Sequence, residues 1–323
     1  MRALTKKNRR RITGRMGQHH FTQRLRKEEI RERNFNSRIH ICPMRMIKSA
    51  LTRVFKLTGL WRRGYREFIN PIVRHNTFAI EGLDPRLEGL TILHLSDLHL
   101  DLDTELTSVI INLLHPLTYD LAVITGDFSD FTIHVDGTAL YEMERIMPAF
   151  SAPVYGVLGN HDSVYDIPKL EAMGIRMLVN DSVTITHNGT ACVLAGIDDP
   201  NIFQTHNLPK ALPKRQHPET PVILLSHSPC IHKEAADHDV DIVLSGHTHG
   251  GQICLPNGGI ILGKIDRGVK HVRKGYWREG GTQGWTSSGT GSCGIPFRLN
   301  CPPEVILHRL TTASTETHRD ECP

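Results

Sequence analysis

Long apolar runs and paired cysteines are both absent from this sequence. No stretch of roughly 18 consecutive apolar residues occurs, so we expect no helix that spans a bilayer. The seven cysteines are an odd number and form no Cys-x-x-Cys pair, which argues against a disulfide framework and a thiolate zinc site. Positive charge at the N-terminus is not followed by an apolar stretch, so we expect no secretory signal and a cytoplasmic protein.

Acidic residues are scarce in the first 75 positions, which contain 21 Lys and Arg but only four Glu. The rest of the chain is acidic, with 30 Asp and Glu against 17 Lys and Arg. The formal net charge of +4 therefore hides a basic arm attached to an acidic body. The 323 residues, 39% of them apolar, are enough for one large globular domain with an extension.

The basic part of the chain divides into two segments. Residues 1–45 are rich in Arg, Lys and His without a sustained apolar period, which predicts a disordered arm. Residues 46–75 begin as a basic amphipathic helix, expected from Met46 to Trp61. Its apolar positions are Ile47, Leu51, Val54, Phe55 and Trp61. This pattern is typical of a helix lying on an anionic membrane surface, and the alternative is a helix that packs on the body.

Residues 76–311 alternate between short apolar runs and helical stretches, and residues 312–323 form a polar tail. Strands are expected at 91–95, 120–125, 154–158, 222–225 and 242–244, and helices at 102–114, 137–147 and 168–173. This order predicts an α/β fold with a largely parallel central sheet and helices outside. Asn188-Gly189 lies between two apolar runs and predicts a hairpin turn.

A polar cluster follows each of the five expected strands. The clusters are Asp97-Leu98-His99, Gly126-Asp127-Phe128-Ser129-Asp130, Gly159-Asn160-His161-Asp162, Ser226-His227-Ser228 and Gly246-His247-Thr248-His249. Because loops at the carboxyl ends of parallel strands share one edge of a sheet, we expect these side chains to meet. Carboxylate and amide oxygens mixed with imidazoles suit divalent first-row metals. Each cluster alone could be a turn, a helix cap or a buried histidine, but together they predict a metal site.

In type and order, these motifs resemble those of the calcineurin-like metallophosphoesterase family. The resemblance covers about residues 91–310 and implies a four-layer αββα sandwich with two facing mixed sheets. The segments Gly294-Ile295-Pro296-Phe297-Arg298 and Pro303-Glu304 look like those of a bacterial phosphodiesterase branch. That branch includes UDP-2,3-diacylglucosamine pyrophosphatases.

The resemblance also implies how the clusters share two divalent metal ions. The first ion would be held by Asp97, His99, Asp127 and His249, and the second by Asp127, Asn160, His227 and His247. Asp127 would bridge the pair. Two ions ~3.5–4 Å apart clamp the phosphoryl oxygens and activate a water for in-line attack. Manganese is the first expectation, and iron, zinc, nickel and cobalt are compatible with the same ligands.

Two further residues receive catalytic roles from the resemblance. His161 would protonate the leaving oxygen or stabilise charge on the phosphate, which suits an imidazole near neutral pH. Asp130 resembles the carboxylate that hydrogen-bonds this histidine. Asp162 is the alternative orienting residue, or a helix cap. Arg298 is expected in a salt bridge, and contact with substrate is the alternative.

The function predicted by these features is hydrolysis of a phosphodiester or pyrophosphate bond. The basic helix favours a lipid-linked nucleotide such as UDP-2,3-diacylglucosamine, an intermediate of lipid A synthesis, and a peripheral position on the inner membrane face. One alternative is a nuclease or cyclic-nucleotide phosphodiesterase, but an acidic body with 6% aromatic residues offers no nucleic-acid groove, so no specific nucleic acid is expected. A non-catalytic scaffold is disfavoured because every expected ligand and His161 are present.

Overall fold

The computed structural model describes residues 3–37, 43–130, 137–213, 220–261 and 269–313, without the side chains of 35–37 and 43–47. The polar tail expected at 312–323 lies almost entirely outside the described residues. Within these ranges, no helix combines the length and the apolar character that crossing a membrane requires.

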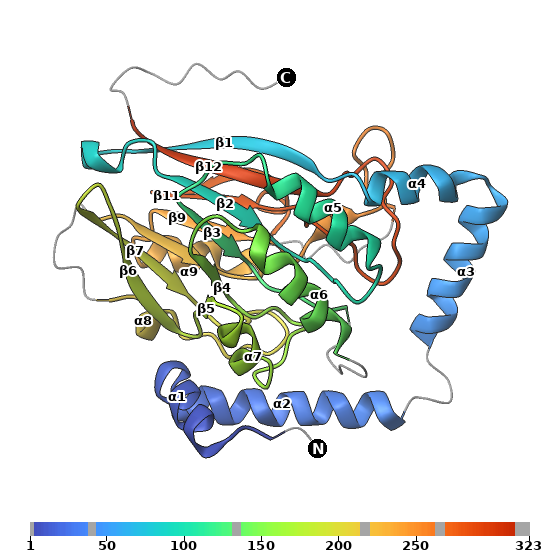
Figure 1. Ribbon diagram of the computed structural model, residues 1–323, viewed down its shortest axis with the longest axis horizontal. Helices are drawn as coiled ribbons and strands as arrows, with labels where there is room; N and C mark the ends of the chain where they lie inside the picture. The colour runs from blue at the N-terminus through green and yellow to red at the C-terminus, as the bar shows by residue number, and fades with distance from the viewer. Residues whose placement is uncertain (1–2, 38–42, 131–136, 214–219, 262–268, 314–323) are drawn as a thin grey trace.

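Two six-stranded sheets form the centre of the molecule (Figure 1). The first has the order β1-β12-β2-β3-β4-β5, with β1 at Ile72–Ile80, β2 at Thr91–Leu95, β3 at Leu121–Ile124, β4 at Val154–Gly156, β5 at Ile175–Met177 and β12 at Glu304–Thr312. The second has the order β10-β11-β9-β8-β7-β6, with β6 at Asp181–His187, β7 at Thr190–Gly196, β8 at Val222–Leu225, β9 at Ile242–Ser245, β10 at Gly275–Glu279 and β11 at Thr282–Thr286. Strands β2 to β5 are parallel, as are β7, β8, β9 and β11, so their carboxyl ends share one edge.

Helices cover the outer faces of both sheets and complete four layers, which confirms the predicted αββα sandwich. The body helices are α5 at Glu105–Leu114, α6 at Thr138–Ile146, α7 at Ile167–Ala172, α8 at Leu208–Ala211 and α9 at His232–Asp237. Short 3₁₀ turns lie at Pro85–Leu87, Met147–Ala149, Pro229–Ile231 and His249–Gly251. Neighbouring strand residues serve different layers: Ile92 packs between the sheets, whereas Leu93 packs under the outer helices. Burial on both faces explains why the strands read as continuous apolar runs.

The predicted hairpin is confirmed. Strands β6 and β7 pair antiparallel, with His187 opposite Thr190. Asn188 and Gly189 between them have φ of 47° and 79°. Two positive φ values in succession are the requirement of a type I′ turn, which Asn-Gly meets well.

The prediction of a disordered arm at 1–45 was wrong for the part that the structure describes. This segment forms α1 at Lys6–Met16 and α2 at Gln18–Ser37, which lie along one side of the body (Figure 1). The Thr5 side chain caps α1 by accepting a hydrogen bond from the Asn8 amide at 3.2 Å. Ile12, Met16 and Phe21 are fully buried in the outer core of the first sheet. Both helices are therefore part of the globular fold.

The single helix expected from Met46 to Trp61 is two helices, α3 at Pro43–Leu57 and α4 at Leu60–Phe68. They separate at Gly59, whose φ of 72° cannot continue a helix. Phe55 stacks on Phe297 with ring centroids 4.2 Å apart, and the Trp61 centroid lies 5.7 Å from the same ring. Part of the apolar face thus packs on the body, as the alternative interpretation required.

The first sheet also begins earlier than the domain boundary expected at residue 76. Strand β1 starts at Ile72 and pairs in parallel with β12, Ile72 lying opposite Glu304. The predicted boundary falls inside this strand. The alternation of apolar and polar residues along β1 is weak because the first residues of the strand are only half-buried. The apolar pattern becomes visible only from Phe78 onward.

Candidate active site

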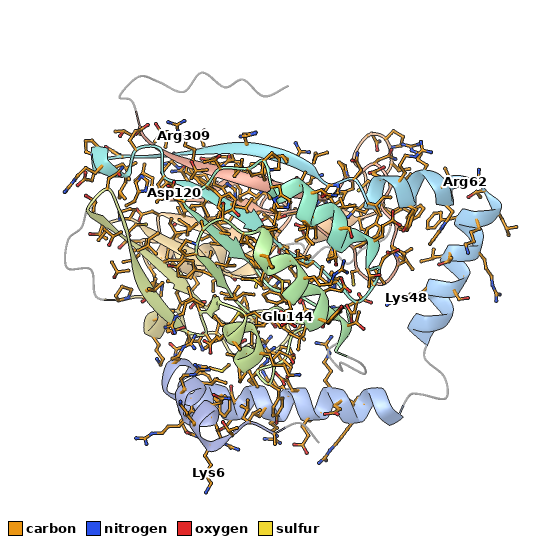
Figure 2. All side chains as sticks on the ribbon, in the orientation of Figure 1. Lys6, Lys48, Arg62, Asp120, Glu144 and Arg309 are labelled. Carbon is orange, nitrogen blue, oxygen red and sulfur yellow. The ribbon has the colours of Figure 1, made fainter. Side chains whose placement is uncertain are left out.

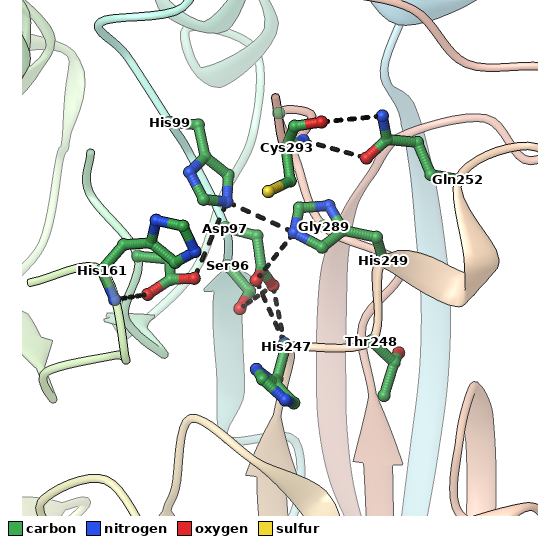
Figure 3. Close-up of polar contacts among 12 residues, drawn as sticks. Ser96, Asp97, His99, His161, His247, Thr248, His249, Gln252, Gly289 and Cys293 are labelled. Carbon is green, nitrogen blue, oxygen red and sulfur yellow. Dashed lines mark hydrogen bonds and ion pairs between the residues drawn. The ribbon is translucent and has the colours of Figure 1, made fainter. Parts of the chain in front are cut away.

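The loops that follow β2, β3, β4, β8 and β9 meet at the carboxyl edge of the two sheets, as predicted. Figure 3 shows His99, His161 and His249 from the loops after β2, β4 and β9 close to one another. Five of the seven expected metal ligands have a left-handed backbone there. Their φ values are 51° at Asp97, 43° at His99, 55° at Asp127, 72° at His247 and 51° at His249. This conformation is costly for residues with a Cβ atom and persists where the surrounding structure imposes it, often at functional sites.

Glycines next to the ligands leave room for their side chains. A Cβ atom on Gly246 would overlap Ser96 Oγ and Asp97 Oδ2, and one on Gly159 would overlap Asp127 Oδ1. The Gly-Asn and Gly-His pairs of the sequence are therefore required by close approach of the carboxylates to the backbone.

Four donor atoms form the first cluster. His99 Nε2 lies 3.3 Å from His249 Nε2 and 3.7 Å from Asp127 Oδ2. His249 Nε2 lies 3.4 Å from Asp97 Oδ1. The other ring nitrogen of His99, Nδ1, donates to the Ser129 carbonyl at 3.0 Å, which leaves the Nε2 lone pair directed into the cluster.

A second group of donors surrounds His227. Its Nε2 lies 3.0 Å from Asn160 Oδ1, 3.2 Å from His247 Nδ1 and 3.3 Å from Asp127 Oδ2. His227 Nδ1 donates to the Thr125 carbonyl at 2.8 Å, so the lone pair of Nε2 again points inward. Asp127 Oδ2 belongs to both clusters, and its Oδ1 is fixed by the His161 amide at 2.8 Å.

The buried carboxylates of this site need positive charge beside them. Burial by itself raises the pKa of Asp127. His227 and neighbouring histidines together outweigh this effect and hold the pKa well below its usual range. In return, burial lowers the pKa of His227 while Asp127 raises it, to about 10. The carboxylates thus favour positive charge at the position where two divalent cations would fit, and the mixed oxygen and imidazole donors suit such ions. Asp97, His99 and Asp127 form one of several groups among the described residues whose donor atoms all lie within 4.8 Å of one another.

His161 lies beside the two clusters, and its contact with Asp130 differs from the expected one. His161 Nδ1 is 2.5 Å from the main-chain oxygen of Asp130, not from its carboxylate. The carboxylate accepts hydrogen bonds from the Gly294 amide at 2.8 Å and from Lys48 Nζ at 3.3 Å. Sequence spacing could place Asp130 near His161, but it could not choose between main chain and side chain.

Asp162 is neither the orienting residue of His161 nor a simple helix cap. Its carboxylate accepts from the amides of Asp127 at 2.8 Å, Phe128 at 2.9 Å and Gly159 at 2.7 Å. These bonds join the loops after β3 and β4. Asp162 therefore sets the relative position of Asp127 and Asn160 without entering either donor cluster.

Among the described residues, Arg298 has no carboxylate at salt-bridge distance, so the expected salt bridge is not found there. Arg298 is fully buried and donates to the carbonyls of Ser288 at 2.6 Å and Gly291 at 2.8 Å. The guanidinium thereby braces the loop between β11 and β12, which passes behind the site.

Sequence reasoning missed two residues at the site. Cys293 offers a thiol within 4.8 Å of donor atoms of His99 and His249. Asn201 contacts the outer nitrogen of His247, Nε2, at 2.8 Å and holds that ring in place. Neither residue follows a strand in a recognisable motif, so the sequence carried no signal for them.

Comparison with known proteins identifies this arrangement. A family model described as Calcineurin-like phosphoesterase matches residues 90–251, which include all seven expected ligands. The uncharacterized metallophosphoesterase YkoQ of Bacillus subtilis is 31% identical over 256 residues, covering 74% of this chain and 90% of its own. Phosphodiesterase YaeI of Escherichia coli is 29% identical over 268 residues, covering 76% and 92%. The solved structure of TT1561 from Thermus thermophilus aligns with a TM-score of 0.40 at 12% identity, covering 62% and 90%. The chain belongs to the calcineurin-like phosphoesterase family and is a metal-dependent phosphoesterase.

Proposed function

We propose that this protein hydrolyses a phosphodiester or pyrophosphate bond with two divalent metal ions held by the two donor clusters. The shared oxygen of Asp127 carries the proposal, because it lies 3.7 Å from His99 Nε2 in one cluster and 3.3 Å from His227 Nε2 in the other. Asp97 and His249 would complete the first ligand set, and Asn160 and His247 the second. When bound, two such ions polarise phosphoryl oxygens and lower the pKa of an attacking water.

The proposed role of His161 is to deliver a proton to the leaving oxygen. The Asp130 carbonyl accepts from Nδ1 at 2.5 Å, so the proton that is transferred belongs to Nε2. The bond from the His161 amide to Asp127 Oδ1 fixes this residue relative to both clusters. His161 is half-buried, which leaves it accessible to a substrate.

The experiment is to measure metal content and turnover in Asp127→Ala. Removing the shared ligand weakens both sites, so we expect the bound manganese to fall from about two ions per chain to one or fewer, with loss of at least about 10³-fold in kcat. Glu144→Gln, on the exposed face of α6, is the matched control and keeps both values (Figure 2). Two bound ions with near-normal turnover in Asp127→Ala would refute the proposal.

The substrate proposed within this activity is a lipid-linked nucleotide such as UDP-2,3-diacylglucosamine, and the metal is manganese. Support comes from the resemblance of residues 294–298 to the bacterial phosphodiesterase branch and from the relative named phosphodiesterase YaeI. A screen of the manganese-loaded protein against phosphomonoesters, cyclic nucleotides and nucleotide-linked lipids tests it. We expect the highest kcat/KM on the nucleotide-linked lipid. Preference for a monoester or a cyclic nucleotide contradicts this choice.

Membrane contact through α3 is proposed from the residues that remain exposed. Val54 and Leu57 are 51% and 87% exposed, and the neighbouring Arg53 and Lys56 are also exposed. Apolar side chains flanked by basic ones favour an anionic lipid surface. We expect the protein to sediment with anionic liposomes and the double variant Val54→Glu, Leu57→Glu to lose this binding. Leu255→Glu, at an exposed leucine elsewhere, serves as control. Equal sedimentation of the double variant and the control, or no binding by any form, rules out this surface.

A further inference from the structure

We propose that Arg31 of α2 and Lys48 of α3 bind the leaving phosphate of a diphosphate substrate and make the site selective for pyrophosphate bonds. The inference rests on the proposed function, because it names the substrate class of the same site. Neither residue belongs to a motif of the body, and both come from the segment that was expected to be an arm and a separate helix.

Arg31 is placed at the site by a firmly seated helix. Helix α2 is anchored by Arg24, which is fully buried and donates to Asp198 Oδ1 at 2.9 Å and to the Asp162 carbonyl at 2.6 Å. These bonds fix α2 against the loop after β4. About two turns further along, Arg31 Nη1 donates to the main-chain oxygen of Asn160 at 2.5 Å. The guanidinium thus lies next to the main chain of a proposed metal ligand and within electrostatic range of His161.

Lys48 reaches the site beside Asp130. Its Nζ lies 3.3 Å from Asp130 Oδ2, and its side chain is 30% exposed (Figure 2). The side chain also packs on Gly294, where an added Cβ atom would lie 2.7 Å from Lys48 Cε. Lys48 therefore has a defined position between the loops after β3 and β11, and retains access to solvent.

Arg31 and Lys48 each contact a residue that adjoins His161. Arg31 binds the carbonyl of Asn160, the residue before His161, and Lys48 binds Asp130, whose carbonyl contacts His161 Nδ1 at 2.5 Å. The group that leaves toward His161 therefore enters a region with two positive charges. Asp127 and Asp130 face this region, and Asp199 and Glu28 also act on Arg31. The proposed metal ions would engage Asp127.

The charge on the leaving group determines how much Arg31 and Lys48 contribute. The water oxygen bonds to the scissile phosphorus and releases one proton to solvent. The bond from phosphorus to the bridging oxygen breaks, and that oxygen leaves with the electron pair and takes up the proton of His161 Nε2. In a pyrophosphate, the departing fragment is a phosphate that already carries negative charge, which Arg31 and Lys48 stabilise. In a nitrophenyl diester the departing fragment carries no second anionic group, so the same cations contribute much less.

The test compares two soluble substrates on the manganese-loaded, full-length protein: UDP-glucose, which contains a pyrophosphate bond, and bis(p-nitrophenyl) phosphate. The measured quantity is the ratio of their kcat/KM values. Because each variant removes one charge-assisted hydrogen bond to the leaving phosphate, the ratio should fall by roughly 10- to 100-fold in Arg31→Gln and in Lys48→Gln. Arg31→Lys should restore most of it. Arg33→Gln is the control on the same helix, since Arg33 is 77% exposed and pairs at the surface with Glu29.

Each outcome has a distinct meaning. An unchanged ratio in Lys48→Gln and Arg31→Gln overturns the inference while the proposed hydrolase stands, and so does a wild-type protein that cleaves only the nitrophenyl diester. No cleavage of either substrate by the wild type overturns the proposed function itself. If Arg31→Gln loses metal or unfolds, Lys48→Gln decides, because Lys48 pairs with Asp130, which is not a proposed metal ligand.

Discussion

Gly246 lies where a side chain of any size would displace a ligand. A Cβ atom there would overlap Ser96 Oγ and Asp97 Oδ2. We expect Gly246→Ala to move Asp97 away from His249, weakening manganese binding by at least about tenfold with a parallel loss of kcat/KM. Gly281→Ala is the control, since Gly281 has open space around it. Metal titration of both variants checks the prediction. If Gly246→Ala binds manganese with wild-type affinity, the loop can move to accommodate the added Cβ atom and the prediction is wrong.

Individual site residues were predictable to the extent that short motifs follow strands. Asp97, Asp127 and His227 converge as expected because the carboxyl ends of parallel strands share an edge. Side-chain direction was not predictable. Asp130 contacts His161 through its carbonyl, and Cys293 enters the site from a loop without a motif, because both depend on packing between segments far apart in the sequence.

At the scale of elements, α2 shows why a basic segment can be misread. Its inner face mixes apolar Phe21 with charged Arg24 and Glu28, both buried. Arg24 Nε donates to Glu28 at 2.8 Å, and the Arg24 guanidinium stacks 3.5 Å from the centre of the Phe203 ring. A high density of charged residues is usually taken as a sign of disorder, whereas in this fold Arg24 and Glu28 are paired with each other. The Ile12–Met16 and Phe21–Leu25 spacings were the available signal, since Leu25 also packs on this core.

We expect Arg24→Ala to destabilise the protein strongly. The change leaves the carboxylates of Glu28 and Asp198 buried without their cation, a loss of about 3–5 kcal/mol in the free energy of unfolding. Arg33→Ala on the exposed side of α2 should cost less than about 0.5 kcal/mol. Urea denaturation compares the two. Similar midpoints for both variants would mean that α2 contributes little to the stability of the body.

At the scale of the whole molecule, a chain of neutral side chains crosses the first sheet. His94 Nδ1 lies 3.2 Å from His308 Nε2, and His94 Nε2 lies 2.9 Å from Thr125 Oγ1. His308 Nδ1 lies 3.1 Å from Asn76 Nδ2, so the chain joins β1, β12 and β2 to Thr125, the residue after β3. The Asn76 side-chain amide donates to His308 Nδ1. His308 Nε2 then donates to His94 Nδ1, and His94 Nε2 donates to Thr125 Oγ1, so all three hydrogen bonds form with both imidazoles neutral. Burial lowers the pKa of His94 to about 3, and burial followed by His94 lowers that of His308 well below its ordinary value.

These shifts predict acid sensitivity. The unfolded chain binds protons on both histidines below about pH 6.5, while the folded protein does not, so their contribution to stability is present above that pH and is lost on acidification toward about pH 3. Each histidine contributes at most about 1.4 kcal/mol per pH unit in this range. Urea denaturation between pH 7.5 and 5 measures the slope. We expect His94→Gln, although less stable, to show a shallower slope than the wild type, and an identical slope would exclude this origin.

The place of β12 has a consequence for the order in which the protein is made. Strand β12 lies between β1 and β2, although about 200 residues or more separate it from both along the chain. A ribosome must therefore reach residue 304 before β1 and β2 acquire their shared neighbour. Until then both strands expose unpaired backbone edges, which other nascent chains could join. The body helices and the parallel strands can assemble earlier, but β1 has no strand to pair with until translation passes residue 304.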